Sequence, residues 1–334
     1  MGGFDFFIIF VRFKRIQNRV FMRKFITFTV LLFVWFGAVS SNSKVWKSLK
    51  KDINIFVISD SGRNGYYDQK PIAEVMGQMA EKISPRCVVA TGDVHHFDGI
   101  QSVQDPLWMT NYELIYSHPK LMIPWLPILG NHEYRGNTKA VIEYSDISRR
   151  WCMPDRYYTE VYKVKGATLR LVMIDTTPII EKYRRSKDAY YADVAKQDYN
   201  EQLEWLNTVL SSATEDWIIV VGHHPIYADT GKSNKERRDM QNRVGETLRR
   251  YEDKVDLYIC GHIHNFQHIR RSDCKIDYIV NSSAARGRSV KAIEGTKFCS
   301  PVPGFSVLAA DKNGLCLHMI NSKGEVLNTI TRTK

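Results

Sequence analysis

Carboxylate, amide and imidazole side chains recur beside glycine at five places along the chain. They are Asp60 in Ser59-Asp60-Ser61-Gly62, Asp93 in Gly92-Asp93-Val94-His95-His96, Asn131 in Gly130-Asn131-His132-Glu133, His223 in Gly222-His223-His224-Pro225, and His262 and His264 in Gly261-His262-Ile263-His264. Any one of them alone is typical of a helix cap or a turn. Together they indicate a single site built from distant segments, because glycine lets a backbone turn tightly and approach a ligand closely.

The donor types indicate which ligand such a site would hold. Two carboxylates, one amide oxygen and several imidazoles suit iron, manganese or zinc, whereas calcium and magnesium prefer all-oxygen sites. The donors are too numerous for one metal ion with an open position, but they fit two ions that share a carboxylate. Pairs of this kind clamp phosphoryl oxygens and generate a hydroxide for in-line displacement.

Short apolar or β-branched runs precede these motifs and are predicted to be strands. The expected strands are Ile53–Ser59, Cys87–Thr91, Ile123–Leu129, Leu169–Ile174, Trp217–Val221, Leu257–Cys260, Tyr278–Asn281, Phe305–Ala309 and Leu315–Ile320. Their near-continuous apolar character is typical of sheets buried on both faces. Since open α/β sheets bind ligands at the carboxyl ends of their strands, the motifs are expected to meet there.

Amphipathic helices are expected between the strands. One is opened by Pro71 and carries an apolar stripe from Ile72 to Met79, and two more have stripes over Leu203–Leu210 and Met240–Tyr251. Turns at 311–314 and 321–324 predict hairpins near the carboxyl terminus. No Pro- or Ser-rich linker divides residues 52–334, so we expect one α/β domain there.

At these motifs the sequence resembles the calcineurin-like metallophosphoesterases, and among them the small animal-type purple acid phosphatases. The resemblance runs over residues 53–330 and includes the stretches 130–133, 144–151 and 202–206. It implies an α/β fold, a four-layer α/β/β/α sandwich of two mixed sheets flanked by helices. It further implies that Asp60, Asp93 and His264 hold one metal ion, that Asn131, His223 and His262 hold a second, and that Asp93 bridges them. By the same resemblance, His132 contacts the substrate phosphate or protonates the leaving oxygen.

Two positions depart from that family. The purple enzymes have an iron-binding tyrosine where this chain has His96, which either ligates from the same helical face as Asp93 or turns away and leaves the position to water. The mammalian enzymes have an active-site histidine where this chain has Lys232, which is either a phosphate contact or a solvated loop lysine. Without a tyrosinate, we expect a divalent pair of iron, manganese or zinc and a colourless protein.

The predicted function is hydrolysis of phosphate monoesters by in-line attack of a metal-activated hydroxide, with His132 and Asp93 as catalytic residues. One alternative is a phosphodiesterase or nucleotidase of the same superfamily, because ester choice depends on loop shape. Another is a phosphate-binding protein that has lost turnover. No Gly-x-Ser-x-Gly motif points to a serine nucleophile.

Composition and charge limit the classes of molecule that the protein is expected to bind. Of 334 residues, 44% are apolar and 25% charged, which excludes a disordered or collagen-like chain. The six cysteines include no Cys-x-x-Cys pair, which argues against a thiolate zinc site. The net charge of +11 is partly concentrated in residues 1–40, and no basic stripe interleaved with aromatic residues appears. We therefore expect a small phosphorylated substrate and no nucleic acid.

Residues 1–41 are expected to be an N-terminal extension followed by a signal peptide. Arg23 and Lys24 precede an apolar run from Phe25 to Val39, and 38–40 form a small-x-small cleavage site, so Met22 is an alternative start. The run is shorter than a membrane-spanning helix requires. The sequence predicts export, periplasmic or secreted, without stable membrane contact once the peptide is cleaved. The alternative is anchoring by an uncleaved N-terminal helix.

Overall fold

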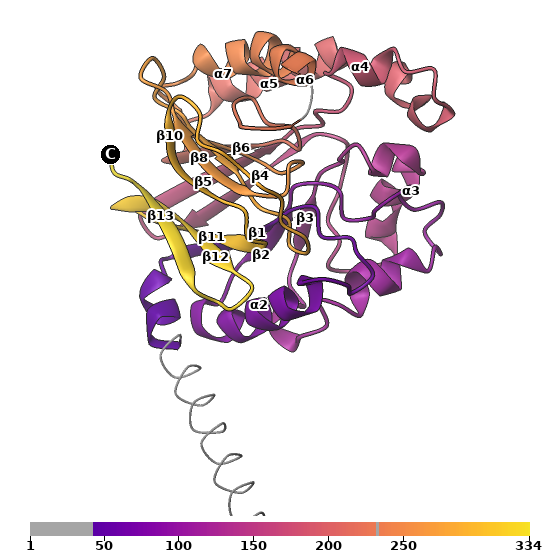
Figure 1. Cartoon of the computed structure of the whole chain (residues 1–334). Coiled ribbons are helices and arrows are strands. Elements are labelled where there is room, and N and C mark those ends of the chain that lie inside the picture. Colours follow the sequence, from indigo (N-terminus) through magenta and orange to yellow (C-terminus); the bar gives the residue numbers. More distant parts are fainter. Residues whose placement is uncertain (1–42, 232–233) are drawn as a thin grey trace, which may run out of the picture. The chain divides into compact units, whose positions relative to one another are not determined.

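Two mixed β-sheets organise residues Leu49–Lys334 in the computed structural model, which describes residues 43–231 and 234–334 (Figure 1). The first sheet has the order β13-β12-β11-β1-β2-β3. Its strands are β1 (Ile53–Ile58), β2 (Cys87–Ala90), β3 (Trp125–Pro127), β11 (Gly304–Asp311), β12 (Gly314–Asn321) and β13 (Val326–Arg332). The strands β1, β2 and β3 are parallel, and β11, β12 and β13 continue the sheet in antiparallel pairs.

The second sheet has the order β10-β8-β9-β7-β6-β5-β4. Its strands are β4 (Tyr158–Val164), β5 (Ala167–Met173), β6 (Trp217–Val221), β7 (Val255–Cys260), β8 (Phe266–Arg270), β9 (Asp277–Val280) and β10 (Thr296–Ser300). Its central strands β5, β6, β7 and β9 are parallel neighbours. The parallel strands of the two sheets supply the carboxyl ends at which the motifs stand.

Helices cover the outer faces of the two sheets. Figure 1 shows α2 (Gln69–Ile83) against the first sheet and α5 (Tyr199–Ser212), α6 (Asn234–Met240) and α7 (Glu246–Arg249) over the second. Two further helices are α3 (Thr138–Glu143) and α4 (Glu181–Arg184). Single turns of 3₁₀- or π-helix are η1 (Met109–Glu113), η2 (Pro119–Leu121), η3 (Glu133–Arg135), η4 (Tyr144–Asp146), η5 (Ala189–Tyr191), η6 (Val194–Lys196) and η7 (Gln241–Gly245). This confirms the predicted four-layer sandwich.

Local sequence explains the two long helices. The stripe of Ile72, Met76 and Met79 in α2 is buried, and the helix ends where Ser84 adopts a left-handed conformation. It begins at Gln69, two residues before the expected Pro71, because proline fits anywhere in a first helical turn. Asp198 caps α5 by accepting hydrogen bonds from the backbone N–H groups of residues 200 and 201.

All nine expected strands are present, with ends that shift by a few residues. The strands β1, β2, β3, β6, β7 and β9 are buried along their whole length, as a sheet covered on both faces requires. Four strands match none of the expected runs, namely β4, β8, β10 and β13, of which β13 alone follows an expected hairpin turn, at 321–324. They lie at or next to the sheet edges and are only partly buried, so they lack an apolar run.

The predicted signal peptide or anchor, residues 1–41, lies outside the residues that the structure describes. Within residues 43–231 and 234–334, no helix has both the length and the apolar character needed to cross a bilayer.

Candidate metal centre

The predicted donors lie directly after five strands and come together across the two sheets. Asp60, Asp93 and Asn131 follow β1, β2 and β3, whereas His223 follows β6 and His262 and His264 follow β7. Hydrogen bonds connect the donors of the first sheet with those of the second. The backbone N–H of His262 donates to Asp60 Oδ2 at 2.8 Å. His223 Nδ1 likewise lies 2.8 Å from the carbonyl oxygen of Thr91 in the first sheet. The strand ends of both sheets thus build one site.

Four of these residues have a left-handed backbone. The φ angles of Asp60, Asp93, His262 and His264 are 49°, 55°, 74° and 59°. Residues other than glycine rarely adopt such angles, and they tend to do so at functional sites where the surroundings enforce them. The chain therefore turns sharply after β1, β2 and β7, where these side chains enter the site.

Gly261 permits the approach of β1 and β7 at the centre of this arrangement. A Cβ at this position would overlap the side chains of Ser59 and Asp60. The absence of a side chain lets the chain entering His262 pass directly against the carboxylate of Asp60.

The predicted metal donors form a cluster with two sides. One side consists of Asp60, His96 and His264. Each offers a ligand atom within 4.8 Å of the others, and all three side chains are buried. His264 Nε2 lies 3.2 Å from Asp60 Oδ1, and His264 Nδ1 faces the carbonyl oxygen of Arg286 at 3.0 Å. That carbonyl holds a proton on Nδ1, which leaves the Nε2 lone pair directed at the cluster.

Asp93 lies between this side and the opposite one. Its Oδ2 atom is 3.6 Å from His96 Nε2 and 3.2 Å from His223 Nε2. On the far side, His223 Nε2 is 3.2 Å from His262 Nδ1. The carboxylate of Asp93 therefore adjoins both halves of the cluster, as a bridging ligand would.

The loop after β3, which carries Asn131 and His132, lies against Asp93. The His132 N–H donates to Asp93 Oδ1 at 2.9 Å, and a Cβ on Gly130 would overlap the same oxygen. The His132 ring is partly exposed, with Nε2 3.9 Å from Asp93 Oδ2 and Nδ1 2.6 Å from the carbonyl oxygen of Phe97. Lys232, the remaining predicted site residue, lies outside the described residues.

Several donor atoms of the cluster are buried without a hydrogen-bond partner among the described residues. They are Asp60 Oδ1, Asn131 Oδ1 and both ring nitrogens of His96. Burying such atoms unpartnered costs free energy, and a cation is the ligand that carboxylate, amide oxygen and imidazole lone pairs share. The donor set therefore fits metal ions.

Two buried carboxylates that the sequence analysis did not assign support the cluster. Glu133 accepts hydrogen bonds from the backbone N–H groups of Asp93, Gly130 and His95 at 2.8, 2.8 and 3.1 Å. Burial, and then the charge of Asp93, raise the pKa of Glu133 to about 7. Glu133 follows His132 in the motif Gly130-Asn131-His132-Glu133, so its sequence position already indicated a role at the site.

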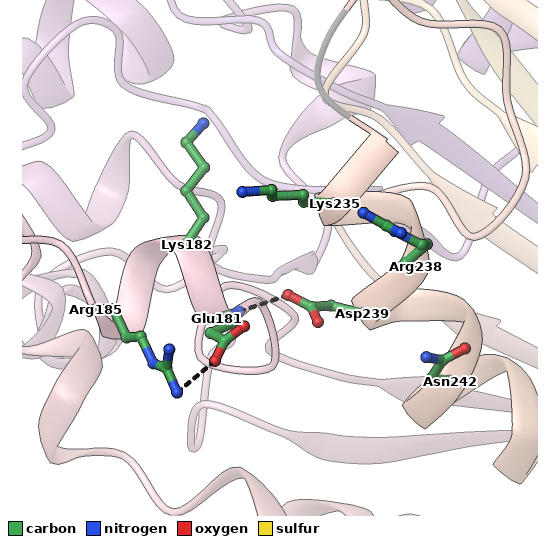
Figure 2. A pocket seen from close by; sticks show the side chains of 7 residues that line it. All are labelled: Glu181, Lys182, Arg185, Lys235, Arg238, Asp239 and Asn242. Atoms are coloured by element: carbon green, nitrogen blue, oxygen red, sulfur yellow. Dashed lines mark hydrogen bonds and ion pairs between the residues drawn. The ribbon is translucent and has the colours of Figure 1, made fainter.

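The second carboxylate, Glu236, comes from α6. Its Oε2 atom lies 3.3 Å from His262 Nε2, and its Oε1 atom lies 2.7 Å from Lys182 Nζ. Lys182 in turn lines a surface pocket of about 570 Å³, drawn in Figure 2 with Lys235, Arg238 and the Glu181–Arg185 ion pair. No sequence pattern points to Glu236, because this residue stands in a charged stretch typical of a solvent-exposed helix.

Comparisons with known proteins agree with this geometry. The family model described as calcineurin-like phosphoesterase matches residues 53–266. Purple acid phosphatase 4 from Arabidopsis thaliana is 32% identical over 83% of this chain and 82% of its own length. Tartrate-resistant acid phosphatase type 5 from Homo sapiens is 29% identical over 55% of this chain and 56% of its own.

A solved structure shows the same fold. It is titled "GAP50 the anchor in the inner membrane complex of Plasmodium" and superposes with a TM-score of 0.70, at 24% identity over 84% of this chain and 88% of that one. At this identity the likeness concerns the fold alone. The family match, the relatives and the clustered donors lead to one conclusion: the chain belongs to the calcineurin-like phosphoesterases and is a metal-dependent phosphoric ester hydrolase related to the purple acid phosphatases.

Proposed function

We propose that this protein hydrolyses phosphate monoesters at a pair of divalent metal ions. The observation that supports this most strongly is the set of buried, unpartnered donor atoms on Asp60, His96 and Asn131 at the junction of the two sheets. Relatives named purple acid phosphatases at about 30% identity support the same chemistry.

In this proposal Asp60, His96 and His264 hold one ion, Asn131, His223 and His262 hold the other, and Asp93 bridges them. The position of His96 within 4.8 Å of both Asp60 and His264 supports ligation over the alternative in which it turns away. Because His96 supplies a neutral imidazole and no anionic oxygen, we propose manganese, zinc or ferrous iron and a protein without a visible charge-transfer band.

Such a metal pair supplies charge neutralisation for the phosphoryl oxygens and acidifies a water molecule for in-line attack. The chain itself supplies orientation. The Phe97 carbonyl holds a proton on His132 Nδ1, so that Nε2 faces the side of Asp93 on which a substrate would lie. There His132 binds the phosphoryl group or protonates the leaving oxygen. We also propose Lys232 as a phosphate contact.

We propose that the partner is a small phosphorylated molecule and not nucleic acid or a membrane. We further propose that the protein is exported, on the basis of the basic, apolar and small residues that follow one another from Met22 to Ser40. An uncleaved anchor would place the same domain at a membrane surface.

The test compares hydrolysis of nitrophenyl phosphate, a monoester, with that of bis(nitrophenyl) phosphate, a diester, before and after chelation. We expect the monoester to react faster and chelation to abolish both reactions. Asp93→Asn and His262→Ala should each lower kcat/KM for the monoester at least about 1000-fold, since metal ligation contributes several kcal/mol to the barrier reduction.

Matched controls are Asp273→Asn and His118→Ala, which alter the same residue types away from the cluster and should leave the rate within about twofold. A faster reaction of the diester would contradict the monoester proposal and identify a phosphodiesterase. Near-normal rates in Asp93→Asn would contradict the metal assignment.

A further inference from the structure

Arg63 is a buried cation next to the metal centre that lacks an anionic partner. It stands three residues after Asp60 and is 8% exposed. Within the described part of the chain, no carboxylate lies within ion-pair distance of its guanidinium, and its side chain makes one long hydrogen bond, to the carbonyl oxygen of Gly62 at 3.5 Å. Burying a charge without a direct ion pair costs free energy, which a bound anion would offset.

Arg63 lies beside the loop that carries Asp93 and Phe97. The Gly62 N–H donates to the carbonyl oxygen of Asp93 at 3.4 Å, which fixes the loop after β1 against the loop after β2. Arg63 Cζ lies 4.9 Å from the centre of the Phe97 ring, and that ring lies 6.2 Å from the ring of His132. Phe97 is 65% exposed, and Arg63 and His132 both lie next to its ring.

The charges around Arg63 and the proposed metal ligands favour the binding of an anion. Burial lowers the pKa of Arg63 by more than Asp60 and Asp93 raise it, but the ordinary pKa of arginine is so high that the guanidinium stays charged. With two divalent ions bound, those two carboxylates would offset half of the metal charge, and Arg63 would add to the excess. A dianionic phosphoryl group balances more of this excess than a monoanionic one.

We propose that Arg63 binds the phosphoryl group of the substrate and makes the site selective for dianionic monoesters over monoanionic diesters. Guanidinium groups bind phosphate oxygens through two parallel hydrogen bonds, which a diester offers less readily because two of its oxygens carry substituents. Arg286 and Arg288 lie on the His264 side of the site, but both are exposed, so solvent screens their charges. The inference rests on the proposed monoesterase function.

The first measurement titrates inorganic phosphate into zinc-loaded wild-type protein and its Arg63→Gln and Arg63→Lys variants by calorimetry. Loss of a charge-assisted hydrogen bond should raise the phosphate dissociation constant of Arg63→Gln about 10- to 100-fold. The dissociation constant of Arg63→Lys should lie between those of the wild type and Arg63→Gln, because lysine keeps the charge but cannot form two parallel hydrogen bonds. Zinc content and thermal unfolding should match the wild type, which shows that the variants fold.

The second measurement compares the two nitrophenyl esters. In Arg63→Gln, kcat/KM for the monoester should fall by the same 10- to 100-fold and that for the diester by less than about threefold. The control is Arg288→Gln, an exposed arginine of the same region, which should change either value by less than about twofold.

Three results would overturn the inference: an unchanged phosphate dissociation constant in Arg63→Gln, an equal loss for monoester and diester, or an equal effect of Arg288→Gln. The last would show that general positive charge suffices. The phosphate titration needs no turnover, so it tests Arg63 even if the wild type fails to hydrolyse the monoester and the proposed function is wrong.

Discussion

At the scale of single residues, three of the four histidines proposed as ligands are oriented by a partner on the nitrogen that faces away from the cluster. Both ring nitrogens of the fourth, His96, lack a hydrogen-bond partner among the described residues. The Thr91 carbonyl orients His223, the Arg286 carbonyl orients His264, and the carboxylate of Glu236 orients His262. Such partners fix the ring and its tautomer, and a carboxylate also increases the basicity of the ligating nitrogen. The sequence motifs mark the proposed ligands, but they do not show these partners.

Glu236 provides the test at this scale. Glu236→Ala should weaken zinc binding at one of the two sites about 10- to 100-fold, because His262 loses the carboxylate that orients it. Zinc titration against a competing chelator measures both affinities. Glu181→Ala removes an exposed, ion-paired glutamate of the neighbouring α4 and serves as the control. Two affinities equal to those of the wild type would show that Glu236 has no positioning role.

At the scale of elements, the sharp ends of the strands determine the site. The sequence was sufficient to predict the interior strands and the motifs after them, because continuous apolar runs and glycines mark both. It did not reveal β4, β8 and β10, whose partly exposed residues carry no such pattern. It also could not show that α6 brings Glu236 to His262, since that contact depends on how a helix packs across the second sheet.

Gly261 tests the close approach of β1 and β7. Gly261→Ala should destabilise the fold by about 1–3 kcal/mol, because the new methyl group would displace Ser59 and Asp60. Metal affinity should fall in parallel, since Asp60 is a proposed ligand. Gly231→Ala is the matched control, because a Cβ there meets nothing within 4 Å. Denaturant unfolding of metal-free protein measures the first effect, and equal stabilities of the two variants would contradict it.

At the scale of the whole domain, the centre is divided between the two sheets. The first sheet contributes Asp60, Asp93 and Asn131, and the second contributes the three histidines after β6 and β7. Bound metal would therefore tie the sheets together at their carboxyl ends, and ligands that bind only the folded state stabilise it. The order of motifs along the chain was enough to predict the family and the four-layer fold. The position of Arg63 near Phe97 and His132 depends on the folded domain and could not be predicted from the motifs.

The number of metal ions per chain tests the central claim most directly. Elemental analysis of purified protein, alongside its Asp93→Asn variant, should find two divalent ions per wild-type chain and fewer in the variant, because Asp93 would be a ligand of both. A wild-type protein that hydrolyses the monoester with one ion or none per chain would contradict the account.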